Sequence, residues 1–246
     1  GTIMVIAGLV AGGSGTRMKQ AMPKQFLLLD GEPVLLRTLR VFLVAREIDA
    51  VLIAVPKEWT DYTKELLKSL PEELQGVKRT EVCEGGTSRN DTVRILSEEA
   101  VVRFRASDED ILLTHDAVRP MVSLRMISET VGAMKDAFAV TAAIPSGDTV
   151  VLSADGKRVS QVPKRETVYR IQTPQLIRIG LLRELLASVP ADDPGVTDLC
   201  SLCERRGIKP VLVNGAYENI KITVPTDLAF CEAILRERVR EEQENV

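Results

Sequence analysis

Short apolar runs alternate with amphipathic stretches over the first two thirds of this chain, and this alternation restricts its fold more than any other feature. The runs have the length of buried strands, and the stretches between them carry apolar residues at helical spacing. The predicted strands cover 3–10, 49–55, 78–82, 110–114 and 139–144, and the predicted helices cover 34–46, 61–70, 90–103 and 124–137. Such a pattern indicates a mostly parallel sheet with helices on both faces.

Composition is compatible with that architecture and argues against several classes of protein. With 246 residues, 45% of them hydrophobic, the chain can bury the core of one Rossmann-like α/β domain spanning 1–246. The net charge of -3, with acids and bases interspersed, provides no basic face for duplex nucleic acid. There is no apolar run of about 18 residues and no basic-then-apolar leader, so we expect a cytoplasmic protein without a membrane span.

The four cysteines include one pair, Cys200 and Cys203, with the spacing of a metal or redox motif. No second pair and no histidine follow it, and the segment 198–206 has helical character. We therefore interpret these thiols as small buried groups.

A glycine-rich segment, Ala11-Gly-Gly-Ser-Gly-Thr-Arg17-Met, follows the first predicted strand, and Pro23-Lys24-Gln25 follows it in turn. Glycines let backbone N–H groups approach phosphate oxygens closely, and Arg17 and Lys24 add positive charge. The third glycine of the dinucleotide fingerprint is replaced by Met18, and the P-loop lysine is absent after Gly15. The segment therefore predicts a triphosphate cradle outside the hydride-transfer and P-loop classes.

Two further polar motifs follow predicted strands. In Glu84-Gly-Gly86-Thr-Ser-Arg89-Asn-Asp-Thr92, the glycines could admit a flat base, although a capped helix start would produce the same pattern. In His115-Asp116-Ala-Val-Arg119, the aspartate is suited to Mg²⁺ beside a triphosphate, and the arginine to an anion. A lone histidine is more often structural than catalytic, so we expect no base role for His115.

The alternation ends at Ser146. Residues 150–152 and 158–162, joined by a turn at 153–156, predict a β-hairpin arm at about 147–168 that projects from the sheet. Because a protruding hairpin cannot bury its own apolar face, we expect it to pair with a second subunit in a homodimer. Gln172-Thr-Pro-Gln175 is interpreted as a compact polar turn, and Lys221 is predicted on a short strand before the last helix.

These motifs, in this order, resemble the cytidylyltransferases that activate sugar-alcohol phosphates, over roughly residues 5–234. Two branches share the pattern, one acting on 2-C-methyl-D-erythritol 4-phosphate in isoprenoid synthesis and one on D-ribitol 5-phosphate in teichoic-acid or capsule synthesis. The segment Met22-Pro-Lys-Gln-Phe26, together with Val118 and Leu199, is more similar to the ribitol branch. We therefore favour ribitol 5-phosphate as the acceptor and keep methylerythritol 4-phosphate as the alternative.

The resemblance implies CTP as co-substrate, Mg²⁺ on Asp116 and three sets of site residues. Those for the nucleotide are Ala11, Gly12, Gly13, Gly15, Gly86, Arg89, Thr92 and Asp116. Those for the acceptor are Arg119, Thr149, Arg165, Thr173, Thr197 and Lys221. Catalysis is assigned to Arg17, Lys24, Arg165 and Lys221, and the counterpart of Arg165 in that family reaches into the partner's active site.

Two other interpretations use the same loop. A protein that senses cytidine nucleotides could carry it without turnover, although a sensor does not need the second anion cluster that Arg119, Arg165 and Lys221 would form. An enzyme for UTP or another nucleotide is also compatible, because the base pocket is only partly defined by the sequence.

Overall fold

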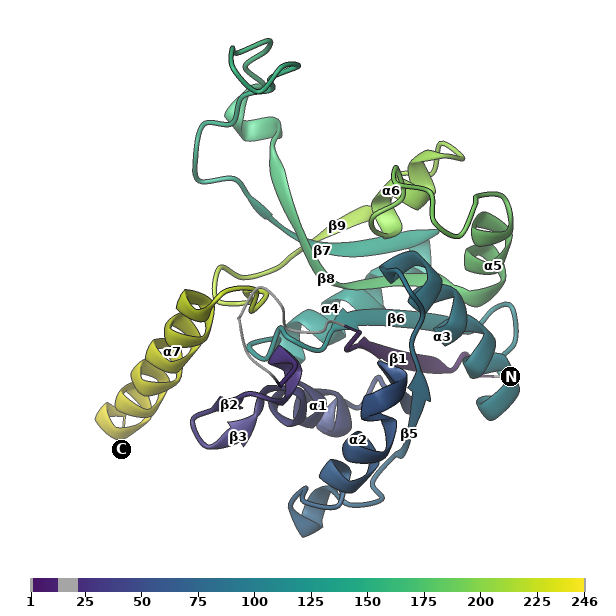
Figure 1. Ribbon diagram of the computed structural model, residues 1–246, viewed down its shortest axis with the longest axis vertical. Coiled ribbons are helices and arrows are strands. Elements are labelled where there is room, and N and C mark those ends of the chain that lie inside the picture. The colour runs from purple at the N-terminus through teal and green to yellow at the C-terminus, as the bar shows by residue number, and fades with distance from the viewer. Residues whose placement is uncertain (1, 13–21, 246) are drawn as a thin grey trace.

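The computed structural model describes residues 2–12 and 22–245, and Figure 1 shows a central sheet with helices on both faces. The sheet has seven strands in the order β5-β4-β1-β6-β8-β7-β9. All neighbouring strands pair in parallel except β8, which is antiparallel to both β6 and β7. The strands are β1 (Val5–Val10), β4 (Ala50–Val55), β5 (Arg79–Glu84), β6 (Ile111–Asp116), β7 (Ala139–Pro145), β8 (Tyr169–Arg178) and β9 (Val211–Asn214). The predicted fold class is confirmed.

The helices divide between the two faces of the sheet. They are α1 (Val34–Val44), α2 (Thr60–Leu67), α3 (Arg89–Phe104), α4 (Leu124–Ala133), α5 (Ile179–Ala187), α6 (Leu199–Glu204) and α7 (Pro225–Glu244). Short 3-10 turns lie at η2 (Lys24–Phe26), η3 (Lys57–Trp59), η4 (Glu72–Leu74), η5 (Met134–Asp136) and η6 (Arg165–Thr167), and β2 (Leu28–Leu29) pairs with β3 (Glu32–Pro33). None of the helices in the described parts of the chain is long and apolar enough to cross a membrane.

Strand alternation explains how the two faces are covered. In β1, Val5, Ala7 and Leu9 belong to a core cluster with residues of α1 and α4, whereas Ile6 belongs to a second cluster with α3, α5 and α6. The central strands are apolar on both sides because both sides are buried. A Cβ on Gly8 would lie 3.0 Å from Leu96, so glycine lets α3 approach this strand closely.

A third, smaller cluster attaches the last helix. Leu228, Ile234 and Leu235 of α7 pack against buried residues that include Val118 and Ile222. The backbone N–H of Ile222 also donates to the carbonyl of Val118, at 2.9 Å. The segment just before α7 is therefore held against the loop that follows β6.

The segment between β7 and β8 projects from the body of the protein, as Figure 1 shows. Only Leu152 and Gln161 form an antiparallel bridge, so the two strands predicted at 150–152 and 158–162 are wrong as continuous strands. Val151, Leu152, Val159 and Val162 are exposed and have no sheet to pack on. A two-stranded ribbon without a packing surface is only marginally stable, which accounts for the difference.

Two other local expectations were wrong. Gln172 to Gln175, interpreted as a polar turn, lies inside β8, where the Thr173–Pro174 peptide bond is cis and the register with β7 shifts. Lys221, expected on a strand, lies in a non-regular segment between β9 and α7. No neighbouring strand is available there, because the segment is tied to the loop after β6 instead.

Candidate active site

Two pockets meet at the edge of the sheet where β1 and β6 end. The first pocket, of about 230 Å³, is lined among the described residues by Val10, Ala11, Gly12, Lys24, Gln25, Gly86, Thr87, Ser88, Arg89, Thr92, Asp116, Val118 and Lys221. The second pocket, of about 340 Å³, is lined by Arg89, Asp116, Arg119, Ile171, Gln172, Thr173, Gln175, Thr197, Asp198, Cys200 and Lys221. Arg89, Asp116 and Lys221 line both pockets, and we call these three residues the junction.

The loop before α3 shapes one wall of the first pocket. The hydroxyl of Thr92 accepts from the backbone N–H of Gly86 at 3.0 Å and donates to the carbonyl of Ser88 at 2.9 Å. The side chain of Ser88 caps α3 by accepting from the N–H of Asp91. A Cβ on Gly86 would clash with the side chain of Asp91, so a larger residue there would displace that side chain.

Lys24 enters the first pocket from the short turn η2, which is fixed on two sides. The amide of the buried Gln25 donates to the carbonyl of Ala11 at 2.7 Å, which ties the turn to the end of β1. Phe26 packs against Trp59 and Tyr62, with ring centroids 5.2 and 4.9 Å away. Three of the other predicted loop residues, Gly13, Gly15 and Arg17, lie outside the described part of the chain.

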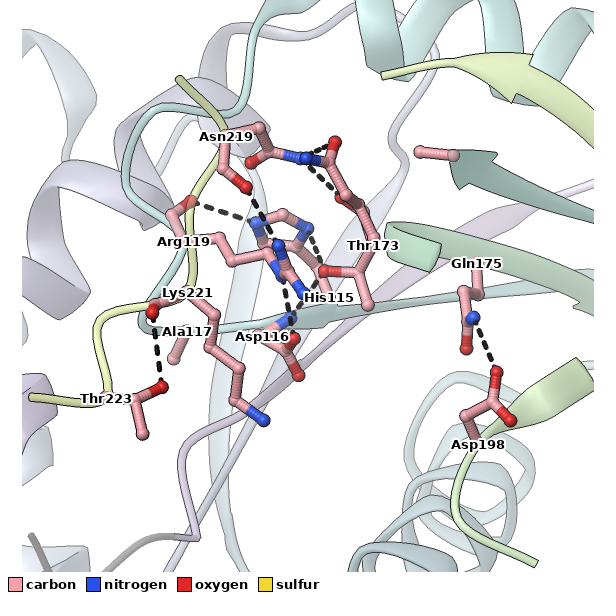
Figure 2. A network of polar contacts seen from close by, with 12 residues as sticks. His115, Asp116, Ala117, Arg119, Thr173, Gln175, Asp198, Asn219, Lys221 and Thr223 are labelled. Carbon is pink, nitrogen blue, oxygen red and sulfur yellow. Dashed lines mark hydrogen bonds and ion pairs between the residues drawn. The ribbon is translucent and has the colours of Figure 1, made fainter. Parts of the chain in front are cut away.

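Asp116 lies at the centre of the junction and is almost completely buried. Arg89 binds one of its carboxylate oxygens, and Nε of Arg119 donates to the other at 2.9 Å. Figure 2 shows Lys221 extending toward the same carboxylate. Burial alone would raise the pKa of Asp116, but the charges of Arg89, Arg119 and Lys221 outweigh it and hold the pKa well below its usual value. The carboxylate is therefore ionised at every working pH.

His115 belongs to the hydrogen-bond network around Asp116. Its Nδ1 lies 2.9 Å from the hydroxyl of Thr173, which also accepts from the backbone N–H of Asp116 at 3.1 Å. Its Nε2 lies 3.1 Å from the carbonyl of Arg119, which can only accept. This pattern fits a neutral imidazole with its proton on Nε2. Full burial lowers the pKa of His115 to about 4, which agrees with the expected structural role.

The second pocket is built from β8 and the start of α6. The carboxylate of Asp198 caps α6 and accepts from the amide of Gln175 at 3.1 Å, while Gln175 also donates to Thr141. Figure 2 shows Asp198 and Lys221 on opposite sides of Asp116. Arg119 is held by the carbonyl of Asn219, 2.8 Å from Nη1.

The predicted site residues that the structure describes fall into three groups. Ala11, Gly12, Lys24, Gly86, Arg89, Thr92 and Asp116 line the first pocket, and Arg119, Thr173, Thr197 and Lys221 line the second or both. Thr149 and Arg165 line neither pocket, because both belong to the projecting arm. Sequence reasoning does not identify the buried amides of Gln25, Gln175 and Asn219 as site residues, because it does not show their hydrogen-bond partners, which are not neighbours in the sequence.

The junction has the donor chemistry for one magnesium ion held mainly by substrate. Magnesium usually takes one or two protein carboxylates together with phosphate oxygens and water. Asp116 supplies one carboxylate, and each of its oxygens keeps a lone pair beyond the arginine contact. The described residues contain no cluster of three or more histidine, cysteine, aspartate or glutamate side chains that could hold a metal ion without substrate.

Comparison with known proteins gives a consistent result. Residues 4–237 match the model of the 2-C-methyl-D-erythritol 4-phosphate cytidylyltransferase family. The chain is similar to the structure of 4-diphosphocytidyl-2C-methyl-D-erythritol synthase from Anaerococcus prevotii DSM 20548, with 29% identity, a TM-score of 0.80, and coverage of 95% of this chain and 99% of that one.

Two further structures extend the comparison. The 2-C-methyl-D-erythritol 4-phosphate cytidylyltransferase of Francisella tularensis is 27% identical with a TM-score of 0.75, covering 93% of this chain and 98% of that one. The 2-C-methyl-D-erythritol 4-phosphate cytidylyltransferase of Thermus thermophilus is 28% identical with a TM-score of 0.69, covering 96% of this chain and 100% of that one. All three proteins are named for methylerythritol and none for ribitol, so the expected preference for the ribitol branch is not supported.

Proposed function

The chain belongs to the 2-C-methyl-D-erythritol 4-phosphate cytidylyltransferase family, and from this premise we propose that it transfers CMP from CTP to 2-C-methyl-D-erythritol 4-phosphate. As a member, it is a nucleotidyltransferase that uses CTP and a polyol phosphate. Membership of an enzyme family rules out the non-catalytic sensor considered from the sequence. The identity of the polyol phosphate is the part that we propose.

The proposed reaction type is supported mainly by the pair of pockets that share Arg89, Asp116 and Lys221. A transfer between two anionic substrates requires that their reacting groups meet, whereas the remaining parts of each substrate need separate space. The junction provides cations from both arginine and lysine, and the carboxylate of Asp116 fixes Arg89 and Arg119. We therefore assign CTP to the first pocket and the acceptor to the second.

In the proposed reaction, an oxygen of the acceptor phosphate attacks the α-phosphorus of CTP. A new P–O bond forms, and the bond to the bridging oxygen of the departing pyrophosphate breaks. The acceptor phosphate is already anionic near neutral pH, so no general base is needed, which is consistent with the buried and neutral His115. Lys24, together with Arg17, is assigned to stabilising the charge that grows on the transferring group. Bound magnesium would neutralise triphosphate charge at Asp116.

Methylerythritol 4-phosphate replaces ribitol 5-phosphate as the preferred acceptor for two reasons. The similar proteins are named for it. In addition, two of the residues that favoured the ribitol branch are buried in hydrophobic clusters, Val118 with α7 and Leu199 with α5. Val118 also lines the first pocket, but neither residue lines the second, so they carry little information about the acceptor.

The remaining parts of the proposal concern the arm. We assign it to a homodimer in which Arg165 and Thr149 contact the acceptor of the partner subunit. The exposed apolar residues of the arm, Val151, Leu152, Val159 and Val162, support pairing with a second copy. The described body of each subunit would then act as one nucleotidyltransferase domain.

The test is pyrophosphate release by the purified protein with Mg²⁺ and each of four nucleoside triphosphates. Each nucleotide is paired with methylerythritol 4-phosphate and with ribitol 5-phosphate at equal concentrations. We expect release with CTP and methylerythritol 4-phosphate, with kcat/KM at least tenfold above any other pair. A higher kcat/KM with ribitol 5-phosphate would reject the proposed acceptor while leaving the reaction type in place.

A further inference from the structure

The second pocket contains one apolar strip in an otherwise polar wall. The strip is formed by Ile171 of β8 and Cys200 of α6. The other lining residues carry charges or hydrogen-bonding groups, and they are Arg89, Asp116, Arg119, Gln172, Thr173, Gln175, Thr197, Asp198 and Lys221. A fully hydroxylated polyol phosphate has no apolar branch to place against such a strip.

Strand pairing places both members of the strip over the same face of the sheet. Ile171 pairs directly with Ala143 of β7, so their side chains share a face. Thr141 is two residues before Ala143 and therefore points to that face as well. Cys200 lies against Asp198 and Thr141, and its thiol is hydrogen-bonded to both side chains. Ile171 and Cys200 thus border one short stretch of β7.

Both side chains present apolar surface there. Ile171 is 40% exposed and belongs to none of the three hydrophobic core clusters. Burial, together with the charge of Asp198, raises the pKa of Cys200 to about 12, so its thiol is a neutral and only weakly polar group at working pH. The exposed part of Ile171 faces the second pocket and is therefore available to a bound ligand.

We infer that the apolar strip contacts the methyl branch of the acceptor and that Ile171 is a specificity-determining residue. This inference rests on the proposed function, because methylerythritol 4-phosphate carries a C-methyl group that ribitol 5-phosphate lacks. Burying one methyl group contributes about 0.8 kcal/mol, or roughly fourfold in kcat/KM, and a well-shaped pocket increases the effect to about tenfold. The strip would then raise kcat/KM for the branched acceptor relative to its unbranched equivalent.

The test compares methylerythritol 4-phosphate with D-erythritol 4-phosphate, which has the same phosphate and hydroxyl groups without the methyl branch. The ratio of their kcat/KM values, measured with CTP, is the methyl preference of the enzyme. We expect a preference of about four- to tenfold in the wild type. In Ile171→Ala it should fall below about twofold, through loss of kcat/KM for the methylated acceptor alone.

Ile3→Ala is the matched control, because Ile3 is 43% exposed and lines neither pocket. It should keep the wild-type preference. If Ile171→Ala folds poorly, as judged by its thermal unfolding midpoint, Ile171→Thr and Cys200→Ser provide the same comparison, since each places a hydroxyl in the strip.

Two results would overturn the inference, and they can be told apart. An unchanged methyl preference in the strip variants, or an equal loss for both acceptors, rejects the strip while the wild type still uses methylerythritol 4-phosphate. A wild type that uses CTP but does not accept methylerythritol 4-phosphate rejects the proposed acceptor as well.

Discussion

Replacing Thr173 by valine tests whether the polar network behind Asp116 stabilises the protein. The substitution keeps the shape of the side chain and removes only its hydroxyl. That hydroxyl accepts from the backbone N–H of Asp116 and donates to Nδ1 of His115, and all three residues are buried. The backbone pairing of β6 with β8 ends at Thr114 and Gln175, so the hydroxyl replaces a strand partner at this point.

The expected loss follows from the two groups that valine leaves without partners. His115 cannot adapt by moving its proton to Nδ1, because Nε2 faces the carbonyl oxygen of Arg119 and must donate. An unsatisfied buried donor or acceptor costs roughly 1–3 kcal/mol. Two such groups therefore predict a decrease of about 2–6 kcal/mol in the free energy of unfolding, a large part of the 5–15 kcal/mol typical of a domain.

Thr130→Val is the matched control. Thr130 is also fully buried, but its hydroxyl only donates to the carbonyls of Met126 and Ile127 within α4. Its loss should cost about 1 kcal/mol or less, since no buried donor is left without an acceptor. Both variants would be unfolded in urea, followed by the fluorescence of the single tryptophan, Trp59, and by far-ultraviolet circular dichroism. Equal losses in the two variants would refute the reasoning.

Three further predictions address the site and the thiols. Lys24→Ala should lower kcat about 10² to 10³-fold without changing the unfolding midpoint, because one preorganised cation is lost, and near-normal pyrophosphate release would remove its assigned role. Arg165→Ala should raise KM for the acceptor. If the two subunits share their sites, heterodimers of an Arg165→Ala subunit and a Lys24→Ala subunit should regain activity. Verified heterodimers without activity would argue against a shared site. Burial raises the pKa of Cys83, Cys203 and Cys231 to about 11, so at pH 8 iodoacetamide should modify the native thiols about a hundredfold more slowly than the unfolded ones. Equal rates by mass spectrometry would contradict that expectation.

The sequence predicted the parts of the fold that depend on local pattern. The strand expected at 49–55 is Ala50–Val55, and that at 139–144 is Ala139–Pro145. Both strands are buried on two faces, so their apolar runs are unbroken. The same rule explains why Ala11, Gly86 and Asp116 line one pocket, because each lies at the end of a parallel strand or just after it.

Strand β8 could not be predicted in this way. Its Gln172-Thr-Pro-Gln175 segment has the composition of a turn, yet its polar side chains are buried by partners far away in the sequence. Gln175 bonds Asp198, Thr173 bonds His115, and Gln172 bonds the backbone of Ala216. Local periodicity contains no information about such contacts, and the same holds for Gln25 and its bond to Ala11.

The three side chains that serve both pockets have a consequence for how this family can diverge. A substitution at Arg89, Asp116 or Lys221 alters both pockets at once, so under the proposed assignment of CTP and acceptor, selection for a new acceptor acts there only at the expense of nucleotide handling. Positions that line the second pocket alone, such as Ile171 and Thr197, are not subject to that conflict. Lineages that exchange one polyol phosphate for another are therefore expected to conserve the junction and to accumulate their adaptive changes around it.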